Sequence, residues 1–397
     1  MSWRVACCSV VVLALVATVA AQAPNATYFP DRADWQRRTP QEAGLDAVTL
    51  QDAIKFATAN ENPAPKDQAL ARAQNVGAHE PFDTLIGPTR ERAALNGLIL
   101  RGGYVVAEWG DTTRVDMTYS VTKTFLSTVV GLAWQKGWIR DVNDKVRDYM
   151  PPDVELFDEP HNQPITWYNL LRQTSDWQGT LWGKPDWADR PEGNSSEWSN
   201  RKLYEPGTHY KYNDVRVNVL ALALLHVIRR PLPEVLREEV MDPIGASTTW
   251  RWYGYDNSWI ELDGRKVQSV PGGGHWGGGM FISAWDMARF GYLFLRNGKW
   301  RDRQIVSEKW IQMARTSGTA NPQYGYANWF LNTGRKSLPA APESSVAFRG
   351  SGSNIVYLDW QNDLVVVVRW INNRAVNEFI GKVLGAIQSD PPLKGTK

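Results

Sequence analysis

Two groups of short apolar segments, one near each end of the chain, follow the pattern of β-strands. Near the N-terminal end, residues 97–100 and 104–109 are rich in β-forming residues and flank Arg101-Gly102-Gly103, which predicts a hairpin. Near the C-terminal end, three more segments predict strands: 345–348, 354–359 and 364–371. We therefore expect one antiparallel sheet assembled from both ends of the chain.

Apolar residues with helical spacing mark much of the remaining chain. The strongest pattern covers residues 122–135, where Phe125, Leu126 and Val129 share one face, and it stops at Lys136-Gly137, a typical helix C-terminus. Further segments with helical character are 50–57, 215–229, 232–240, 286–297, 307–316 and 374–388. Most of the predicted helices thus lie between the two groups of predicted strands, and we find no internal repeats.

These elements predict an α+β fold with two regions. Residues 22–140 and 269–397 are expected to form a central antiparallel sheet flanked by helices. Residues 141–268 contain Trp- and Pro-rich loops and two of the predicted helices, and we expect them to form a mostly helical insertion. A chain of 397 residues is long enough for such an arrangement.

Composition narrows the possible functions. Hydrophobic residues make up 43% of the chain and charged residues 22%, as in soluble globular proteins with a sizeable core. The formal net charge is +2 and no block of like charge occurs, so we expect no nucleic acid partner. The 20 tryptophans exceed what core packing usually needs and indicate aromatic-lined loops or clefts.

The first 21 residues have the features of an export signal. Arg4 precedes an apolar run from Val5 to Ala21, and small residues follow where a signal peptidase would cut. The alternatives are a membrane anchor, or a lipoprotein anchor, which the early position of Cys7 disfavours. We predict cleavage, a periplasmic or secreted protein, and no stable membrane insertion afterwards. Both cysteines, Cys7 and Cys8, would then be lost, which excludes thiolate catalysis and disulfides.

Ser120 and Lys123 form the sharpest candidate for chemistry. They lie three residues apart at the start of the predicted helix 122–135, so their side chains share one face. A serine hydroxyl needs a base to become a nucleophile, and a lysine on an apolar helix face can act as one because desolvation lowers its proton affinity. The helix N-terminus adds N–H groups that stabilise an oxyanion. Ser120 as an ordinary first-turn residue is the alternative.

A second candidate stands before the predicted helix 215–229. Tyr212 lies close to a lysine in Pro206-Gly207-Thr208-His209-Tyr210-Lys211-Tyr212-Asn213-Asp214, and a phenol in that position can exchange protons with a serine hydroxyl. The alternative is a tyrosine packed at the helix entrance with Asp214 as the N-cap.

In this order, the motifs resemble those of the serine beta-lactamase and penicillin-binding protein superfamily. The resemblance is to its class C beta-lactamase-like branch, which includes esterases, D-amino peptidases and aminohexanoate-oligomer hydrolases. Ser120-Val121-Thr122-Lys123 matches the S-x-x-K motif, and Tyr212-Asn213-Asp214 is similar to the Y-x-N motif. Further matches lie at 165–175, 272–280 and 283–290. The resemblance implies a beta-lactamase/transpeptidase-like fold, with Ser120 as the nucleophile and Lys123 and Tyr212 handling protons.

The chain departs from this family pattern in two places. Asp214 replaces the asparagine of the second motif, which puts a carboxylate in or near the cleft. The third motif, usually Lys or His, then Thr or Ser, then Gly, is replaced by Gly350-Ser351-Gly352-Ser353, which lacks the cation. Arg349 precedes it, but strand alternation aims this residue at the opposite face. We expect Asp214 and residues 350–353 to contact substrate, with the N–H of Ser353 as the second oxyanion donor.

Metal ions and cofactors are not predicted. None of the five histidines has metal-ligand spacing, and Gly272–Gly279 lacks the G-K-[ST] ending of a phosphate-binding loop. His275, in this glycine run, is a possible cleft residue. The histidines are His79, His161, His209, His226 and His275.

The sequence leaves three functions open. The first is a serine hydrolase acting through an acyl-enzyme on a small-molecule ester or amide. The second is a class C beta-lactamase or D-Ala carboxypeptidase acting on beta-lactams or cell-wall peptides, which the missing cation disfavours. The third is a non-catalytic ligand-binding protein that has kept the fold.

Overall fold

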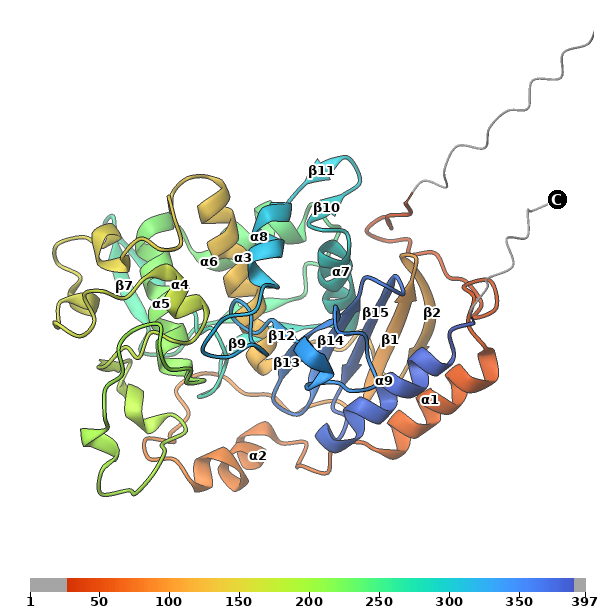
Figure 1. The fold of residues 1–397 in the computed structure, drawn as a ribbon, viewed down its shortest axis with the longest axis horizontal. Coiled ribbons are helices and arrows are strands. Elements are labelled where there is room, and N and C mark those ends of the chain that lie inside the picture. The colour runs from red at the N-terminus through yellow and green to blue at the C-terminus, as the bar shows by residue number, and fades with distance from the viewer. Residues whose placement is uncertain (1–26, 389–397) are drawn as a thin grey trace, which may run out of the picture.

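The computed structural model describes residues 27–388, so the predicted export signal, residues 1–21, lies outside the described residues. Its main sheet contains β1 (Asn96–Arg101), β2 (Tyr104–Trp109), β12 (Phe330–Leu331), β13 (Val346–Gly350), β14 (Asn354–Asp359) and β15 (Leu364–Arg369). The strand order is β12-β13-β14-β15-β1-β2, and all pairs are antiparallel (Figure 1). The five predicted strands and the sheet built from both chain ends are confirmed.

Helices cover both faces of this sheet. The helices α1 (Ala47–Ala59) and α9 (Val376–Gly385) pack together on one face, and α7 (Ala284–Leu295) packs on the other (Figure 1). Residues 364–368 of β15 form an unbroken apolar run because alternate side chains enter two separate cores, Val365 and Val367 on the α7 side and Val366 and Val368 on the α1 side.

A second group of helices stands beside the sheet. It comprises α3 (Thr122–Gln135), α4 (Trp167–Leu171), α5 (Asp214–Ile228), α6 (Leu232–Leu236) and α8 (Glu308–Ala314) (Figure 1). A short π-helical turn, Arg237–Met241, continues α6. The helix α3 contacts both α5 and α6 and is buried on all sides from Thr122 to Ala133.

The segment 141–268 contains strands as well as helices. Two short hairpins lie within it: β4 (Thr180–Leu181) with β5 (Lys184–Pro185), and β7 (Trp259–Leu262) with β8 (Arg265–Gln268). Its strand β6 (Arg251–Tyr253) pairs with β9 (Gly279–Ile282), which also pairs with β3 (Asp116–Met117). This small sheet ties the segment to the rest of the molecule next to the turn that carries Ser120.

Three shorter elements complete the fold: α2 (Gln68–Gln74), β10 (Lys299–Trp300) and β11 (Arg303–Gln304). Within residues 27–388, no helix has the length and apolar character that crossing a bilayer requires.

Candidate active site

Ser120 lies in a single 3₁₀ turn, Tyr119–Val121, that leads directly into α3. Tyr119 has a φ of 48°, in the left-handed region that non-glycine residues rarely adopt, and such backbone strain concentrates at functional sites. The hydroxyl of Tyr119 donates to Gln68 Oε1 at 2.7 Å, which anchors the turn to α2.

The strand β13, which ends at the first residue of the segment 350–353 that replaces the third family motif, runs beside the turn that carries Ser120. A Cβ atom on Gly350, the last residue of β13, would lie 2.1 Å from the Thr118 carbonyl oxygen and 3.3 Å from the Ser120 nitrogen. Only glycine permits so close an approach. The buried Arg369 of β15 supports the same turn, because its guanidinium donates to the carbonyls of Met117 at 2.7 Å and Ile282 at 2.6 Å.

Lys123 connects Ser120 to Asp214. Its Nζ donates to Ser120 Oγ at 2.9 Å and to Asp214 Oδ1 at 2.6 Å, and its side chain is 0% exposed. The i, i+3 spacing on α3 therefore brings serine and lysine together, as predicted from the sequence.

Tyr212 completes this group from the segment before α5. Its ring centroid lies 4.7 Å from Lys123 Nζ, and the Ser120 side chain is among the neighbours that lower its pKa. Gln173 holds the segment in place, since its Oε1 accepts from the Asn213 N–H at 2.7 Å and its carbonyl accepts from the Lys211 N–H at 3.0 Å. The structure thus brings the predicted residues Ser120, Lys123 and Tyr212 to one point.

Asp214 is the first residue of α5, and Asn213, rather than Asp214, is the N-cap. The Asp214 carboxylate is 1% exposed, and both of its oxygens pair with cations. Oδ1 accepts from Lys123, and Oδ2 accepts from Arg190 Nη1 at 2.9 Å. Burial alone would raise the pKa of Asp214, but Lys123, Arg190 and His275 together lower it well below its usual range. The carboxylate is therefore ionised at every pH of interest.

The pKa of Tyr212 shifts in the opposite direction. Burial raises it, the neighbouring Asp214 charge raises it further, and Arg190 and the Ser120 hydrogen bond only partly oppose this. Arg190 lies over the phenol ring, with Cζ 5.0 Å from the centroid. The resting phenol is therefore protonated.

Four further residues join the site, and only His275 among them was a candidate from the sequence: Arg190, Asp189, His275 and Glu80. Asp189 accepts from the Asp214 N–H and pairs with Arg190. His275 Nε2 lies 2.6 Å from Glu80 Oε2, and its Nδ1 lies 3.3 Å from Arg190 Nη2. The glycine run made His275 a candidate, but no sequence motif distinguishes the other three.

Glu80, Asp189 and His275 place one possible metal-ligand atom each within 4.8 Å of one another. We assign no metal to this cluster, because its groups already pair with cations. Arg190 binds Asp189, and Arg72 Nη2 lies 3.9 Å from Glu80 Oε2.

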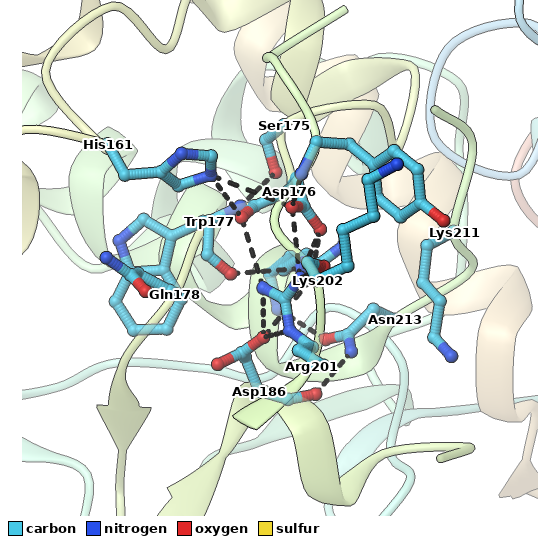
Figure 2. A network of polar contacts seen from close by, with 12 residues as sticks. His161, Ser175, Asp176, Trp177, Gln178, Asp186, Arg201, Lys202, Lys211 and Asn213 are labelled. Carbon is cyan, nitrogen blue, oxygen red and sulfur yellow. Dashed lines mark hydrogen bonds and ion pairs between the residues drawn. The ribbon is translucent and has the colours of Figure 1, made fainter. Parts of the chain in front are cut away.

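A buried ion network fixes the loop that carries Asp189 and Arg190. Figure 2 shows Arg201 between Asp176 and Asp186, and its guanidinium donates to Asp176 Oδ1 at 2.8 Å and to Asp186 Oδ2 at 2.9 Å. Arg216 of α5 donates to the same two carboxylates, and Asn213 Nδ2 donates to the Asp186 carbonyl at 2.7 Å. The loop is thereby joined to the N-terminus of α5.

A cavity of about 280 Å³ opens at this point. The residues discussed above that line it are Gln68, Arg72, Tyr119, Ser120, Arg190, Asp214, His275, Ser351 and Gly352. Gly350 and Ser353, both expected to contact substrate, are not among the lining residues, and neither are Lys123 and Tyr212. Ser353, the expected second oxyanion donor, is 7% exposed, has a φ of 56°, and follows the cavity-lining part of the turn where the chain enters β14.

Two other sequence expectations concern residues around the cavity. Arg349 does not line it, and its guanidinium lies 5.5 Å from the Phe330 ring centroid, consistent with strand alternation. Of the tryptophans in the segment 141–268, Trp167 at the start of α4 and Trp177 are buried, whereas Trp187 and Trp198 line a second cavity of about 260 Å³.

Comparisons with known proteins agree with this geometry. The family model described as Beta-lactamase matches residues 82–376. A 6-aminohexanoate-dimer hydrolase from Paenarthrobacter ureafaciens is 24% identical over 307 residues, which cover 68% of this chain and 70% of that protein.

Two solved structures are similar at low sequence identity, and this similarity concerns the fold. A penicillin-binding protein homologue from Caulobacter crescentus has a TM-score of 0.57 at 11% identity, covering 89% of this chain and 100% of that one. EstCE1, described as a hydrolase with promiscuous acyltransferase activity, has a TM-score of 0.55 at 16% identity, covering 86% and 98%. Since the family model spans well over half of its length, the chain belongs to the Beta-lactamase family, and it is a serine hydrolase of that family.

Proposed function

We propose that this protein hydrolyses a small ester or amide through an acyl-enzyme formed on Ser120. The observation that carries the proposal is the convergence of three groups. Lys123 Nζ donates to the Ser120 hydroxyl at 2.9 Å and lies 4.7 Å from the centroid of the Tyr212 ring. A serine hydroxyl beside two groups that can transfer protons is equipped for nucleophilic attack.

The reaction proceeds in two stages. Ser120 Oγ attacks the carbonyl carbon while Lys123 or Tyr212 accepts its proton, and that proton then passes to the leaving group. The N–H groups of Ser120 and of the turn at 351–352 are the candidates for holding the oxyanion, because both line the cavity. Water then attacks the acyl-enzyme by the reverse proton route and frees Ser120.

Esters and amides rank above beta-lactams as substrates. The third motif lacks its cation, and Arg349 lies over Phe330 instead of lining the cavity. The relative from Paenarthrobacter ureafaciens is named for hydrolysis of an amide, and EstCE1 for hydrolase and acyltransferase activity. Hydrolysis of beta-lactams or D-Ala peptides is the second candidate, favoured by the family match itself.

Replacing the nucleophile tests the proposal. Ser120→Ala should abolish labelling by a fluorophosphonate and lower turnover of a short-chain nitrophenyl ester by about 10³-fold or more. The exposed Ser199 offers a matched control, since Ser199→Ala should change neither measurement. Retained turnover in Ser120→Ala, or labelling of wild type without any turnover, would contradict it.

A chromogenic cephalosporin measured beside the nitrophenyl ester separates the two substrate classes. We expect kcat/KM to be higher for the ester, and the reverse order would favour the beta-lactam alternative.

We also propose that the protein is exported, on the basis of the signal-like residues 1–21. Expression of the full chain in a bacterium should give activity in the periplasm or medium, with an intact mass that lacks the signal. A cytoplasmic chain of full mass would contradict this.

A further inference from the structure

A carboxylate stands where the resembling Y-x-N motif has an uncharged amide. Asp214 is 1% exposed, and its Oδ1 lies 2.6 Å from the Nζ of Lys123, which is itself 0% exposed. The carboxylate stabilises the ammonium form of Lys123, because deprotonation of Lys123 would leave the buried carboxylate with one cation fewer.

The same carboxylate also acts on Tyr212, two residues earlier in the chain. A phenolate there would stand beside the Asp214 charge, and the two would repel each other. Asp214 therefore disfavours the basic form of both groups that can accept the Ser120 proton.

We propose that Asp214 is a positioning residue that sets the pH at which this hydrolase becomes active, because it holds Lys123 and Tyr212 together in their protonated resting form. This inference rests on the proposed function. To become a base, the Lys123–Tyr212 pair must first release one proton to solvent. The pair then accepts the proton of Ser120 as the serine–acyl bond forms, and passes it to the leaving group.

The prediction is the same whichever residue of the pair is the base. A neutral lysine beside a phenol and an ammonium beside a phenolate contain the same number of protons, so both appear after the same ionisation of the coupled pair. Asp214 opposes that ionisation in either case.

The other groups around the pair do not cancel this effect. Arg190 favours phenolate at Tyr212, but it is shared between Asp214 and Asp189. His275 approaches Asp214 Oδ2 at 4.0 Å and pairs with Glu80, which lies near Arg72. The remaining titratable neighbours are three tyrosines whose pKa values are raised by burial: Tyr210, Tyr255 and Tyr324. Only Asp214 bonds directly to Lys123 among the carboxylates of the described residues.

The experiment compares the pH dependence of nitrophenyl ester hydrolysis in wild type and in Asp214→Asn, with Ser120→Ala subtracting the uncatalysed rate. Wild-type kcat/KM should rise with pH into the alkaline range. In Asp214→Asn the acid limb of this profile, over which kcat/KM rises with pH, should shift to lower pH by about one unit or more. This is the usual effect of removing one close charge. An unchanged acid limb, or one that moves up, would overturn the proposal.

Two further variants separate charge from structure. Asp214→Glu keeps the charge and should return the acid limb towards the wild-type position. Asp189→Asn removes a negative charge from the same cluster without contacting Lys123, so its shift should be smaller. An equal or larger shift in Asp189→Asn would show that general cluster charge, and not Asp214, sets the profile.

A direct measurement covers the case in which Asp214→Asn does not fold. The ¹³Cε signal of Lys123 in the wild-type protein, assigned by its loss in Lys123→Arg, should remain that of an ammonium at about pH 9. A neutral amine at about pH 8 would overturn the inference. If wild type neither hydrolyses the ester nor labels at Ser120, the proposed function fails, while the Lys123 titration still decides this inference.

Discussion

Gly273 shows how a single missing side chain shapes the site. A Cβ atom at this position would lie 1.7 Å from Asp214 Oδ1 and 2.3 Å from Lys123 Nζ. The backbone therefore closes directly over the Lys123–Asp214 ion pair, and the pair keeps its 2.6 Å contact only because residue 273 is glycine.

Gly273→Ala should displace Lys123 or Asp214 by about 1 Å and lower kcat/KM for the ester by about 100-fold, the typical cost of such a misplacement. Steady-state kinetics measure this. Gly385→Ala is the control, because a Cβ there meets nothing within 4 Å, and it should leave kcat/KM unchanged. Wild-type activity in Gly273→Ala would mean that the ion pair tolerates movement.

At the scale of elements, the two-residue strand β5 fixes an adjoining loop through one buried lysine. Lys184 Nζ donates to the carbonyls of Phe82 and Thr84, both at 2.7 Å. Burial, together with the charge of Arg72, lowers the pKa of Lys184 to about 8. This side chain thus ties the hairpin β4–β5 to the chain that follows α2.

The shift makes stability depend on pH. The unfolded chain holds the Lys184 proton up to about pH 10.4, whereas the folded chain releases it near pH 8. Between these pH values the unfolded state binds more protons than the folded state. The free energy of unfolding therefore increases as the pH rises from 8 to about 10.4. Lys184→Met lacks this gain. The free energy of unfolding of wild type minus that of Lys184→Met, measured with urea, should therefore be more positive at pH 10 than at pH 8.

The half-exposed Lys136 provides the matched control for this comparison. The free energy of unfolding of Lys136→Met should differ from that of wild type by the same amount at pH 8 and at pH 10. A difference for Lys184→Met that does not grow with pH would contradict the prediction.

At the scale of the whole molecule, the sheet separates two hydrophobic cores. The cluster on the α7 side includes Val121 and Phe125, which lie directly behind Ser120. The cluster on the other side lies between the sheet, α1 and α9 and contains Phe379, whose ring packs 6.0 Å from Trp109. Stability and activity should therefore respond separately to changes in the second core.

Phe379→Ala should lower the free energy of unfolding by about 3–5 kcal/mol, as for other buried Phe truncations, while kcat of the folded enzyme stays unchanged. Urea unfolding and ester turnover measure the two quantities. Val48→Ala, at a position 72% exposed on α1, should be nearly neutral in both. A large fall in kcat for Phe379→Ala would show that the cores are coupled.

Much of this organisation could be predicted from the sequence, because local patterns determine it. The apolar run of β15 and the start of α3 agree with their predicted positions. The strand β12 has two residues, too few for a periodic signal. The N–H donor expected at Ser353 lies beyond the cavity lining because β13 ends at Gly350 and the chain turns before that residue.

The polar surroundings of Asp214 were not predictable in the same way. His275 and Glu80 are 195 positions apart in the chain, and Arg190 reaches Asp214 from a loop without any recognisable motif. Such contacts depend on how loops fold over the helices, so only the assembled structure brings them together.

The position of Arg369 has a consequence for biosynthesis. This residue supports the backbone at Met117 from 252 positions further along the chain, and β1 pairs only with β2 until β15 has been made. A nascent chain leaving the ribosome thus carries its serine and lysine for a long period without the frame that orients them. Hydrolytic competence should arise only after β15 has been made, so a truncated product ending before residue 364 would be inert.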